Sequence, residues 1–367
     1  SVAFGAIEPD VVMMDGAAVR KRVRGTYSGP GGASAFDFSV WIPKSDRPVP
    51  AFVQISPRAL EDLYPDEKKI HEGYHLPADL LTSRGFAAAE QAARDATWAT
   101  NTLDAADSLQ LCENRKLVKD APYVWTVGLY SAATDVSKAI EAGREAGKAA
   151  AKAAKRQLLI AHCVRFFPEN VYVRELVESG KYGKVVAADF TRFIAPPKWS
   201  PKGADWFFDE KKSGGVLFDA HVHDADYIAG TFGRPKALSA SFHRNAKGFV
   251  DHTTATFFYK DALITSDSSF AAAASLVWEA SGRVFFEKAT VYFGPFYKAP
   301  LTVYPEVGKP FSPKLPSKTG YEAEIEYFLG MVEGRRQKRI LTAKDARDSI
   351  ALILAERKSA ETGRTVV

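Results

Sequence analysis

The sequence predicts two domains: an α/β domain over residues 1–160 and, over residues 161–367, a domain with an open, mainly antiparallel β-sheet and flanking helices. Three observations lead to this expectation. The length of 367 residues is about twice the ~150 residues of an average domain. A helix-forming segment precedes a short apolar strand near residue 158, which is half of a βαβ crossover. Beyond it, strands with alternating polar and apolar residues are interspersed with amphipathic helices.

The N-terminal domain is expected to begin with strands and to end with a long helix. A glycine-rich turn, Ser28–Gly32, separates the first two strands, and Gly85 follows a short helix over residues 78–83. The segment Asp135–Gln157 has high helix propensity, begins with an acidic residue and ends with basic ones, as the helix dipole favours. The strands are expected over residues 19–23, 36–42, 49–55 and 158–161.

The C-terminal domain is expected to combine helices with clear end signals and short strands. Its first helix, residues 169–179, is closed by Gly180, and a second begins at Val216 after a glycine turn. Thr342 caps the last helix and Gly363 ends it. A further helix is expected over residues 321–333, and strands over residues 184–193, 237–243, 253–259, 262–268, 283–286 and 289–293.

Composition and charge exclude several classes of protein. Hydrophobic residues make up 46% and charged residues 25%, which is ordinary for a globular chain. A net charge of +5 is too small, at this size, to indicate a nucleic-acid partner. Cys112 and Cys163 are too few for a disulfide framework, and no apolar run is long enough to span a bilayer. We therefore expect a cytoplasmic protein without a nucleic-acid or membrane partner.

The densest cluster of titratable residues, Asp219–Asp226, follows the glycine turn Ser213–Gly215. If the segment is helical, Asp219 and His223 lie four residues apart on one face, and Asp226 shares that face. An imidazole flanked by carboxylates has raised basicity and a fixed orientation, which suits a general acid/base near neutral pH. The cluster is therefore the candidate catalytic site.

Two other interpretations of this cluster stay open. A histidine whose hydrogen bonds are satisfied within the fold explains the same pattern without any chemistry. His221 and His223 with the nearby aspartates also resemble zinc or iron ligands, but an H-x-H spacing suits strand positions better than a helix. His71 and His75, four residues apart with Glu67, Glu72 and Asp79 nearby, favour a metal site less than that cluster does. We therefore predict no metal site.

Three separated segments, in this order, carry a resemblance to a known family. They are Ile160–Glu169, Glu178–Val185 and Ser213–Asp226. Together they resemble the Gfo/Idh/MocA family of NAD(P)-dependent sugar and inositol oxidoreductases, and the similarity extends over residues 158–367. The segments Tyr321–Phe328, Thr342–Ala346 and Ser359–Gly363 are also similar to that family.

The resemblance implies an N-terminal Rossmann-like domain, a sugar or polyol substrate, and NAD or NADP as cofactor. It implies that His223 is the acid/base that exchanges a proton with the substrate hydroxyl, and that Asp219 orients substrate and histidine. Arg165 and Asp226 are then expected near the substrate. Trp199 and Trp206 precede the glycine turn and are expected to line the substrate cleft. The family also implies a homo-oligomer that pairs through the open face of the C-terminal sheet.

The cofactor half is atypical. A G-x-G-x-x-G turn, which brings the backbone close to a pyrophosphate, does not occur. Ala99, Thr100 and Asn101 are similar to the family's strand end beside the nicotinamide ribose, and are expected to bind the cofactor. Tyr130 stands where the family has the lysine of its E-K-P motif, and is expected there as a cofactor-binding residue.

Residues 10–95 resemble a different family, the glucuronoyl-esterase-type α/β-hydrolases. The similar segments are Met14–Lys21, Ile42–Lys44, Pro48–Val53 and Pro77–Ala87. The G-x-S-x-G nucleophile elbow of such hydrolases is absent. We therefore predict an oxidoreductase and keep two alternatives: a non-catalytic binding or assembly protein of the same fold, and a carbohydrate esterase-like hydrolase.

Overall fold

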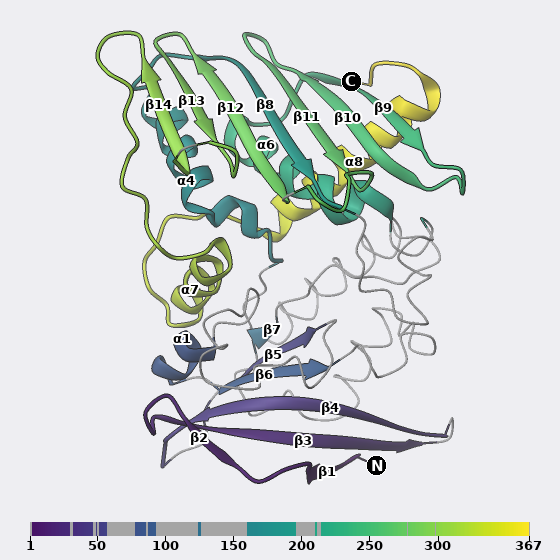
Figure 1. The fold of residues 1–367 in the computed structure, drawn as a ribbon, viewed down its shortest axis with the longest axis vertical. Coiled ribbons are helices and arrows are strands. Elements are labelled where there is room, and N and C mark those ends of the chain that lie inside the picture. The colour runs from purple at the N-terminus through teal and green to yellow at the C-terminus, as the bar shows by residue number, and fades with distance from the viewer. Residues whose placement is uncertain are drawn as a thin grey trace. The chain divides into compact units, whose positions relative to one another are not determined.

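The computed structural model describes residues 2–29, 32–46, 49, 51–56, 78–85, 87–92, 124–125, 160–195, 210, 214–276, 278–297 and 299–366. The chain divides into two compact units (Figure 1). Unit 1 comprises Ser1–Gly128, Ala142–Ala161 and Glu324–Gln337, and unit 2 comprises Leu129–Glu141, His162–Ala323 and Lys338–Val367. The predicted cofactor-binding residues 99–101 and 130, Trp199, Trp206 and the expected helix over residues 135–157 lie outside the described residues.

Unit 1 contains a mixed β-sheet. Its strands are β1 (Val2–Ala6), β2 (Val11–Met13), β3 (Ala18–Gly29), β4 (Gly32–Pro43), β5 (Ala51–Ser56), β6 (Ala87–Ala92) and β7 (Val124–Trp125). The order is β1-β3-β4-β6-β5-β7, with β2 also paired to β3. The β3–β4 hairpin is antiparallel, whereas β5 pairs parallel with β6 and β7. Helix α1 (Ala78–Ser83) falls between β5 and β6 in the chain, as a βαβ crossover requires.

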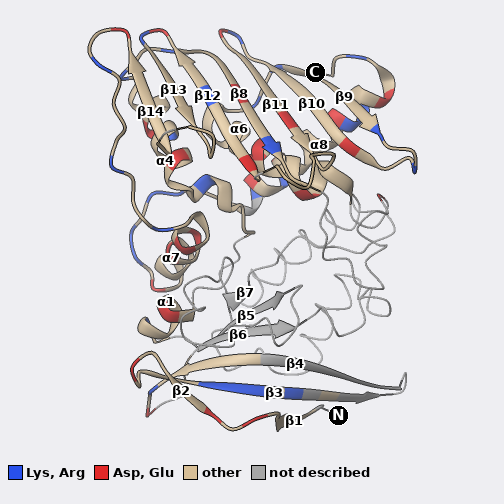
Figure 2. Ribbon diagram, viewed as in Figure 1, with Lys and Arg blue, Asp and Glu red and all other residues tan. Residues whose placement is uncertain are grey.

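Ion pairs hold the N-terminal segment against β3, whose basic run is blue in Figure 2. Arg20 and Arg22 both contact the Glu8 carboxylate, at 2.7 and 3.4 Å, and Lys21 contacts Asp10. Three basic side chains of β3 are therefore paired with two carboxylates of the preceding segment.

Unit 2 is built on a second sheet with the order β14-β13-β12-β8-β11-β10-β9. All its pairs are antiparallel except β8–β11, which confirms the predicted open, mainly antiparallel sheet. The strands are β8 (Val185–Phe193), β9 (Ala237–Arg244), β10 (Val250–Phe258), β11 (Leu263–Ser269), β12 (Glu279–Phe286), β13 (Ala289–Phe293) and β14 (Leu301–Pro305).

The helices of unit 2 cover one face of this sheet (Figure 1). They are α4 (Pro168–Ser179), α6 (Val222–Phe232) and α8 (Ala343–Thr362), preceded by a 3₁₀ turn, η3 (Cys163–Phe166). A further helix, α7 (Gly320–Val332), is divided between the two units. Side chains from the sheet and the helices interdigitate in the core: Phe190 of β8 meets Tyr227 of α6 edge-on, with ring centroids 5.6 Å apart.

Most predicted elements are confirmed, and the misses have identifiable causes. The helix caps at Thr342 and Gly363 are as expected: the Thr342 hydroxyl accepts a hydrogen bond from the Asp345 N–H, and Gly363 has a φ of 66°. The strand expected over residues 158–161 is wrong at Ile160 and Ala161, which are irregular and lead into η3. Strand β14 was not predicted, because Pro300 directly precedes it and Pro305 is its last residue.

Within the residues that the structure describes, no helix combines the length and apolarity needed to cross a bilayer.

Candidate functional site

The titratable cluster begins in a π-turn rather than in a regular helix. Leu217–His221 form this turn, η5, and the Val222 N–H bonds to the Leu217 carbonyl, five residues earlier. Gly214, with a φ of 78°, precedes it, and a Cβ at this position would lie 2.6 Å from the Cβ of Phe218. The turn therefore depends on glycine both for its backbone and for the space beneath Phe218. The helix predicted from Val216 is confirmed, with the correction that Leu217–His221 within it form a π-turn before α6.

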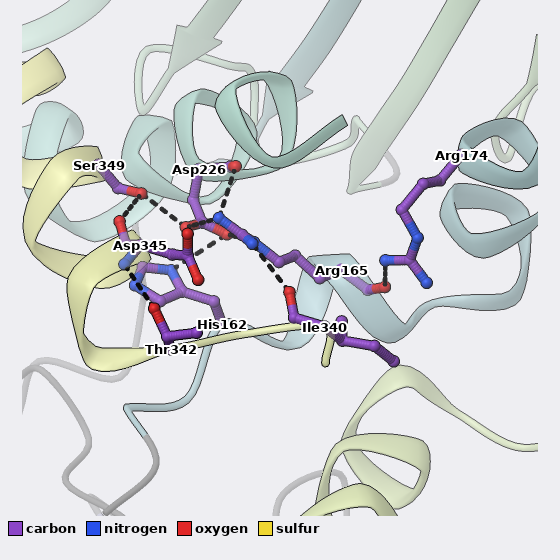
Figure 3. Close-up of polar contacts among 8 residues, drawn as sticks. All are labelled: His162, Arg165, Arg174, Asp226, Ile340, Thr342, Asp345 and Ser349. Carbon is purple, nitrogen blue, oxygen red and sulfur yellow. Dashed lines mark hydrogen bonds and ion pairs between the residues drawn. The ribbon is translucent and has the colours of Figure 1, made fainter. Parts of the chain in front are cut away.

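Asp226 is held by a network of buried groups, shown in Figure 3. Arg165 of η3 donates to its two carboxylate oxygens at 2.7 and 2.9 Å, and Ser349 of α8 donates at 2.6 Å. His162 Nδ1 lies 3.6 Å from the same carboxylate. Burial raises the pKa of Asp226, but these partners outweigh it and the pKa lies below its usual value. Asp226 is therefore a stable anion at neutral pH.

The close approach of Arg165 requires a small residue in α6. A Cβ at Gly230 would lie 2.6 Å from the Arg165 guanidinium carbon. Arg165 also donates to the Ile340 carbonyl, at 3.0 Å, so that one guanidinium joins η3, α6 and the segment before α8. The sequence predicted Arg165 and Asp226 as substrate-binding residues; the structure brings them together as a buried pair, and their role toward a substrate stays a prediction.

Two more residues of the cluster are also ion-paired. Asp224 accepts two hydrogen bonds from Arg192 of β8, at 2.7 and 2.8 Å. His221 Nε2 lies 2.7 Å from a carboxylate oxygen of Glu356 in α8, and both side chains are fully buried. Each pair joins the cluster to a different element, so the π-turn and α6 together are fixed to β8, η3 and α8.

Asp219 and His223 differ from these three residues. Neither side chain makes a hydrogen bond or an ion pair with the residues that the structure describes, and His223 Nδ1 is buried without an acceptor or donor there. Both side chains are half-buried. Burial raises the pKa of Asp219 to about 6. Burial, reinforced by the positive charges of Arg192 and His162, lowers the pKa of His223 to about 3.

The expected raised basicity of His223 is therefore wrong, and the cause is tertiary. The carboxylates of Asp224 and Asp226, which the sequence places beside His223, are neutralised by Arg192 and Arg165. Their attraction for an imidazolium is thus smaller than the cost of burying one. At neutral pH the His223 ring is uncharged and has one nitrogen able to accept a proton.

Sequence reasoning missed the partners of the cluster, which come from distant parts of the chain. Arg192, Ser349 and Glu356 lie in β8 and α8. The sequence did contain one signal for Glu356. Ser349, Ile353 and Glu356 are spaced four and three residues apart, which places them on one face of a helix, and this face of α8 is buried. No three His, Cys, Asp or Glu side chains within the described ranges are placed to hold a metal ion.

Comparison with a family model assigns the domain that carries this cluster. Residues 171–292 match a model described as the GFO/IDH/MocA C-terminal domain. Part of unit 2 is therefore similar to the GFO/IDH/MocA C-terminal domain. The match runs from α4 into β13 and includes every residue from Asp219 to Asp226. The resemblance predicted from the sequence is confirmed for this domain. No curated protein matches the chain by sequence.

The similarity to solved structures extends beyond the segment that the family model matches. Levoglucosan dehydrogenase in its apo form has a TM-score of 0.54 at 15% identity, over 72% of this chain and 76% of that one. UDP-N-acetylglucosamine 3-dehydrogenase GnnA from Acidithiobacillus ferrooxidans has a TM-score of 0.52 at 18% identity, over 72% and 77%. A putative oxidoreductase from Klebsiella pneumoniae has a TM-score of 0.46 at 16% identity, over 62% and 66%. The first two support the α/β fold class predicted from the sequence.

Proposed function

We propose that the protein is an oxidoreductase that transfers a hydride between NAD or NADP and a secondary alcohol of a sugar or polyol. One observation carries the proposal. His221, Asp224 and Asp226 are each ion-paired within the protein, whereas Asp219 and His223 have no such partner in the described part of the chain. Half-buried titratable groups with opposite pKa shifts and no structural partner are typical of sites where protons move.

The family match and the names of two similar structures support the substrate class. The GFO/IDH/MocA domain contains both unpaired residues. The two structures with a TM-score above 0.5 described above are named as dehydrogenases of levoglucosan and of UDP-N-acetylglucosamine, both sugar derivatives. We extend the class, but neither individual substrate, to this protein.

In the oxidation direction, the substrate hydroxyl loses its proton and the adjacent carbon loses a hydride with its electron pair, leaving a carbonyl. The proton passes to the unprotonated ring nitrogen of His223, which burial keeps neutral at the start of the step. We assign to Asp219 the orientation of the hydroxyl. Because its pKa of about 6 lies closer to neutrality, Asp219 also sets the pH dependence of the step.

The hydride needs a carrier that protein side chains do not provide, and the nicotinamide supplies that chemistry when bound. Oxidation of an alcohol also requires a group that accepts the hydroxyl proton. The unpaired imidazole of His223 can accept that proton, so the cluster fits such a cofactor. We propose Ala99, Thr100, Asn101 and Tyr130 as cofactor contacts by family resemblance.

The proposal is tested by measuring the reduction of NAD and NADP with a panel of sugars and polyols. Replacement of His223 by Ala is expected to lower turnover ~100-fold or more. Quenching of tryptophan fluorescence on titration with NADH or NADPH reports cofactor binding separately, and is expected to be unchanged in this variant. His243→Ala is the matched control, since His243 lies in the same domain on β9 and pairs with Asp251.

Each outcome bears on a named part of the proposal. Saturable quenching with a His223-dependent rate supports it in full. A rate that is unaffected by His223→Ala contradicts the assigned acid/base. Absence of both quenching and turnover in the unaltered protein contradicts the oxidoreductase proposal and favours a binding or assembly role.

A further inference from the structure

His221 lies inside the π-turn that carries Asp219, and its ring contacts two other elements. Its Nε2 is 2.7 Å from Oε2 of Glu356 in α8, and its Nδ1 is 2.9 Å from the Ser268 hydroxyl in β11. All three side chains are fully buried. With no exposed surface, the trio cannot meet a substrate, and the proposed hydride transfer does not use it.

The surroundings of His221 favour a charged ring. Burial opposes the charge, but Glu356 from α8, Asp224 from α6 and Asp267 from β11 together outweigh it, so that the pKa of His221 lies above its usual value. A doubly protonated ring donates from Nδ1 to Ser268, and its positive charge lies against the Glu356 carboxylate. Arg192 of β8 is the nearby cation, and it is paired with Asp224. A buried charged pair of this kind tolerates little displacement, because a separated charge is costly there.

A second contact joins α8 to the same turn. Arg357, the residue after Glu356, places its guanidinium carbon 4.9 Å from the centre of the Phe218 ring, an arrangement that attracts a cation. Phe218 and His221 stand on either side of Asp219 in the chain. Helix α8 therefore contacts the π-turn both before and after Asp219.

The π-turn needs such support, because i→i+5 hydrogen bonding is a rare arrangement and a regular helix is its ready alternative. Relaxation to a regular helix would rotate residues 217–221 relative to α6 and carry Asp219 with them. We propose that the His221–Glu356 pair is a positioning device that holds the π-turn and thereby fixes the position of the Asp219 carboxyl. This inference rests on the proposed function only where it predicts a loss of turnover. The predicted change in the titration of Asp219 does not depend on the proposed function.

The test compares Glu356→Gln with a matched control. Glutamine keeps the shape of Glu356 but removes the charge, so burial then leaves the His221 ring neutral. The control is Tyr227→Phe, which removes a different buried hydrogen bond of α6, the 2.9 Å bond from the Tyr227 hydroxyl to the Asn170 carbonyl. Each variant loses one buried interaction, Glu356→Gln at the π-turn and Tyr227→Phe in the helix α6 that follows it.

Two readouts are measured on each protein. Nitrogen-15 NMR of the imidazoles reports whether His221 is protonated, and carbon-13 NMR of the aspartate carboxyls reports the titration of Asp219. In Glu356→Gln we expect a neutral His221 and an Asp219 midpoint displaced from about 6 toward the ordinary 3.8, since the carboxyl is released from its buried position. We expect kcat to fall ~10- to 100-fold with little change in KM for the cofactor. Tyr227→Phe is expected to alter neither titration.

The outcomes separate this inference from the proposed function. If Asp219 titrates in Glu356→Gln as in the unaltered protein, the pair is structural only and the positioning role is overturned. If the Asp219 midpoint moves but no preparation oxidises a sugar, the positioning stands and the proposed function fails. Should Glu356→Gln not fold, Ser268→Ala keeps the charged pair, and a smaller displacement of the Asp219 midpoint in the same direction is required.

Discussion

Asp219 and His223 are neighbours in sequence whose surroundings drive their protonation in opposite directions. Burial favours the neutral acid at Asp219 and the neutral base at His223. Because its pKa of about 6 still lies below neutrality, the Asp219 carboxyl is mostly ionised at neutral pH, and no cation is paired with it among the described residues. The buried, ionised Asp219 carboxyl lowers the stability of the folded protein and has no structural partner that offsets this cost. A role of Asp219 in catalysis explains why such a residue is present.

Replacing Asp219 with Asn is expected to stabilise the protein at high pH and not at low pH. The folded state raises the pKa from 3.8 to about 6, so folded Asp219 binds more protons than unfolded Asp219 between these values. Stability is therefore lost as pH rises through this window, by at most about 3 kcal/mol. Urea unfolding at about pH 4 and about pH 8 should show the two proteins equal at the lower value and the Asn variant more stable at the higher.

The control for this prediction is Asp261→Asn, which alters an exposed carboxyl in the turn between β10 and β11. It is expected to change stability by less than about 0.5 kcal/mol at both pH values. A gain in Asp219→Asn that is equal at both pH values would show that burial does not raise the pKa of Asp219.

At the scale of elements, α6 and the π-turn before it are fixed by buried ion pairs to three neighbours. Arg165 of η3 and Arg192 of β8 pair with residues of α6, and Glu356 of α8 pairs with His221 of the π-turn. Buried pairs add little stability relative to apolar packing, but losing one partner leaves an uncompensated charge. The pairs thus specify where α6 sits, and with it the two unpaired residues.

Replacing Asp226 with Asn is expected to destabilise the protein by about 3–5 kcal/mol, because the buried guanidinium of Arg165 loses its counter-charge. Thermal unfolding followed by circular dichroism measures the effect. Asp348→Asn is the matched control: Asp348 pairs with Lys344 on the exposed face of α8, and its replacement should cost less than about 1 kcal/mol. Equal losses in the two variants would contradict a structural role for the Arg165–Asp226 pair.

The elements that the sequence predicted well have local signals. The last helix was bounded correctly because Thr342 and Gly363 act on the residues beside them, whatever the rest of the fold does. The π-turn was missed because the contacts that accompany it, Glu356 with His221 and Arg357 with Phe218, come from α8, far along the chain. The pKa of His223 was predicted in the wrong direction for the same reason.

At the scale of the whole molecule, the open face of the unit 2 sheet is the predicted surface for homo-oligomerisation. Thr253 and Ala255 of β10 are buried on the helix-covered side, and Thr254 between them is exposed on the other. If copies of the chain pair through this face, Thr254→Lys should lower the mass measured by light scattering during size-exclusion chromatography, since it buries a charge at the interface.

A surface lysine elsewhere controls for its effect on solubility. Ala351→Lys adds the same charge on the exposed side of α8 and should leave the mass unchanged. A mass that is the same for the unaltered protein and for both variants would contradict oligomerisation through this face.

Hydride transfer with His223 as the proton acceptor is tested most directly by following a deuterium label. A sugar or polyol carrying deuterium on the reacting carbon is mixed with oxidised NAD or NADP, and the nicotinamide product is analysed by mass spectrometry. We expect deuterium in the reduced nicotinamide, and a transfer rate ~100-fold or more lower in His223→Ala at saturating cofactor. Reduced nicotinamide without deuterium, or transfer at the same rate in both proteins, would contradict the proposed function.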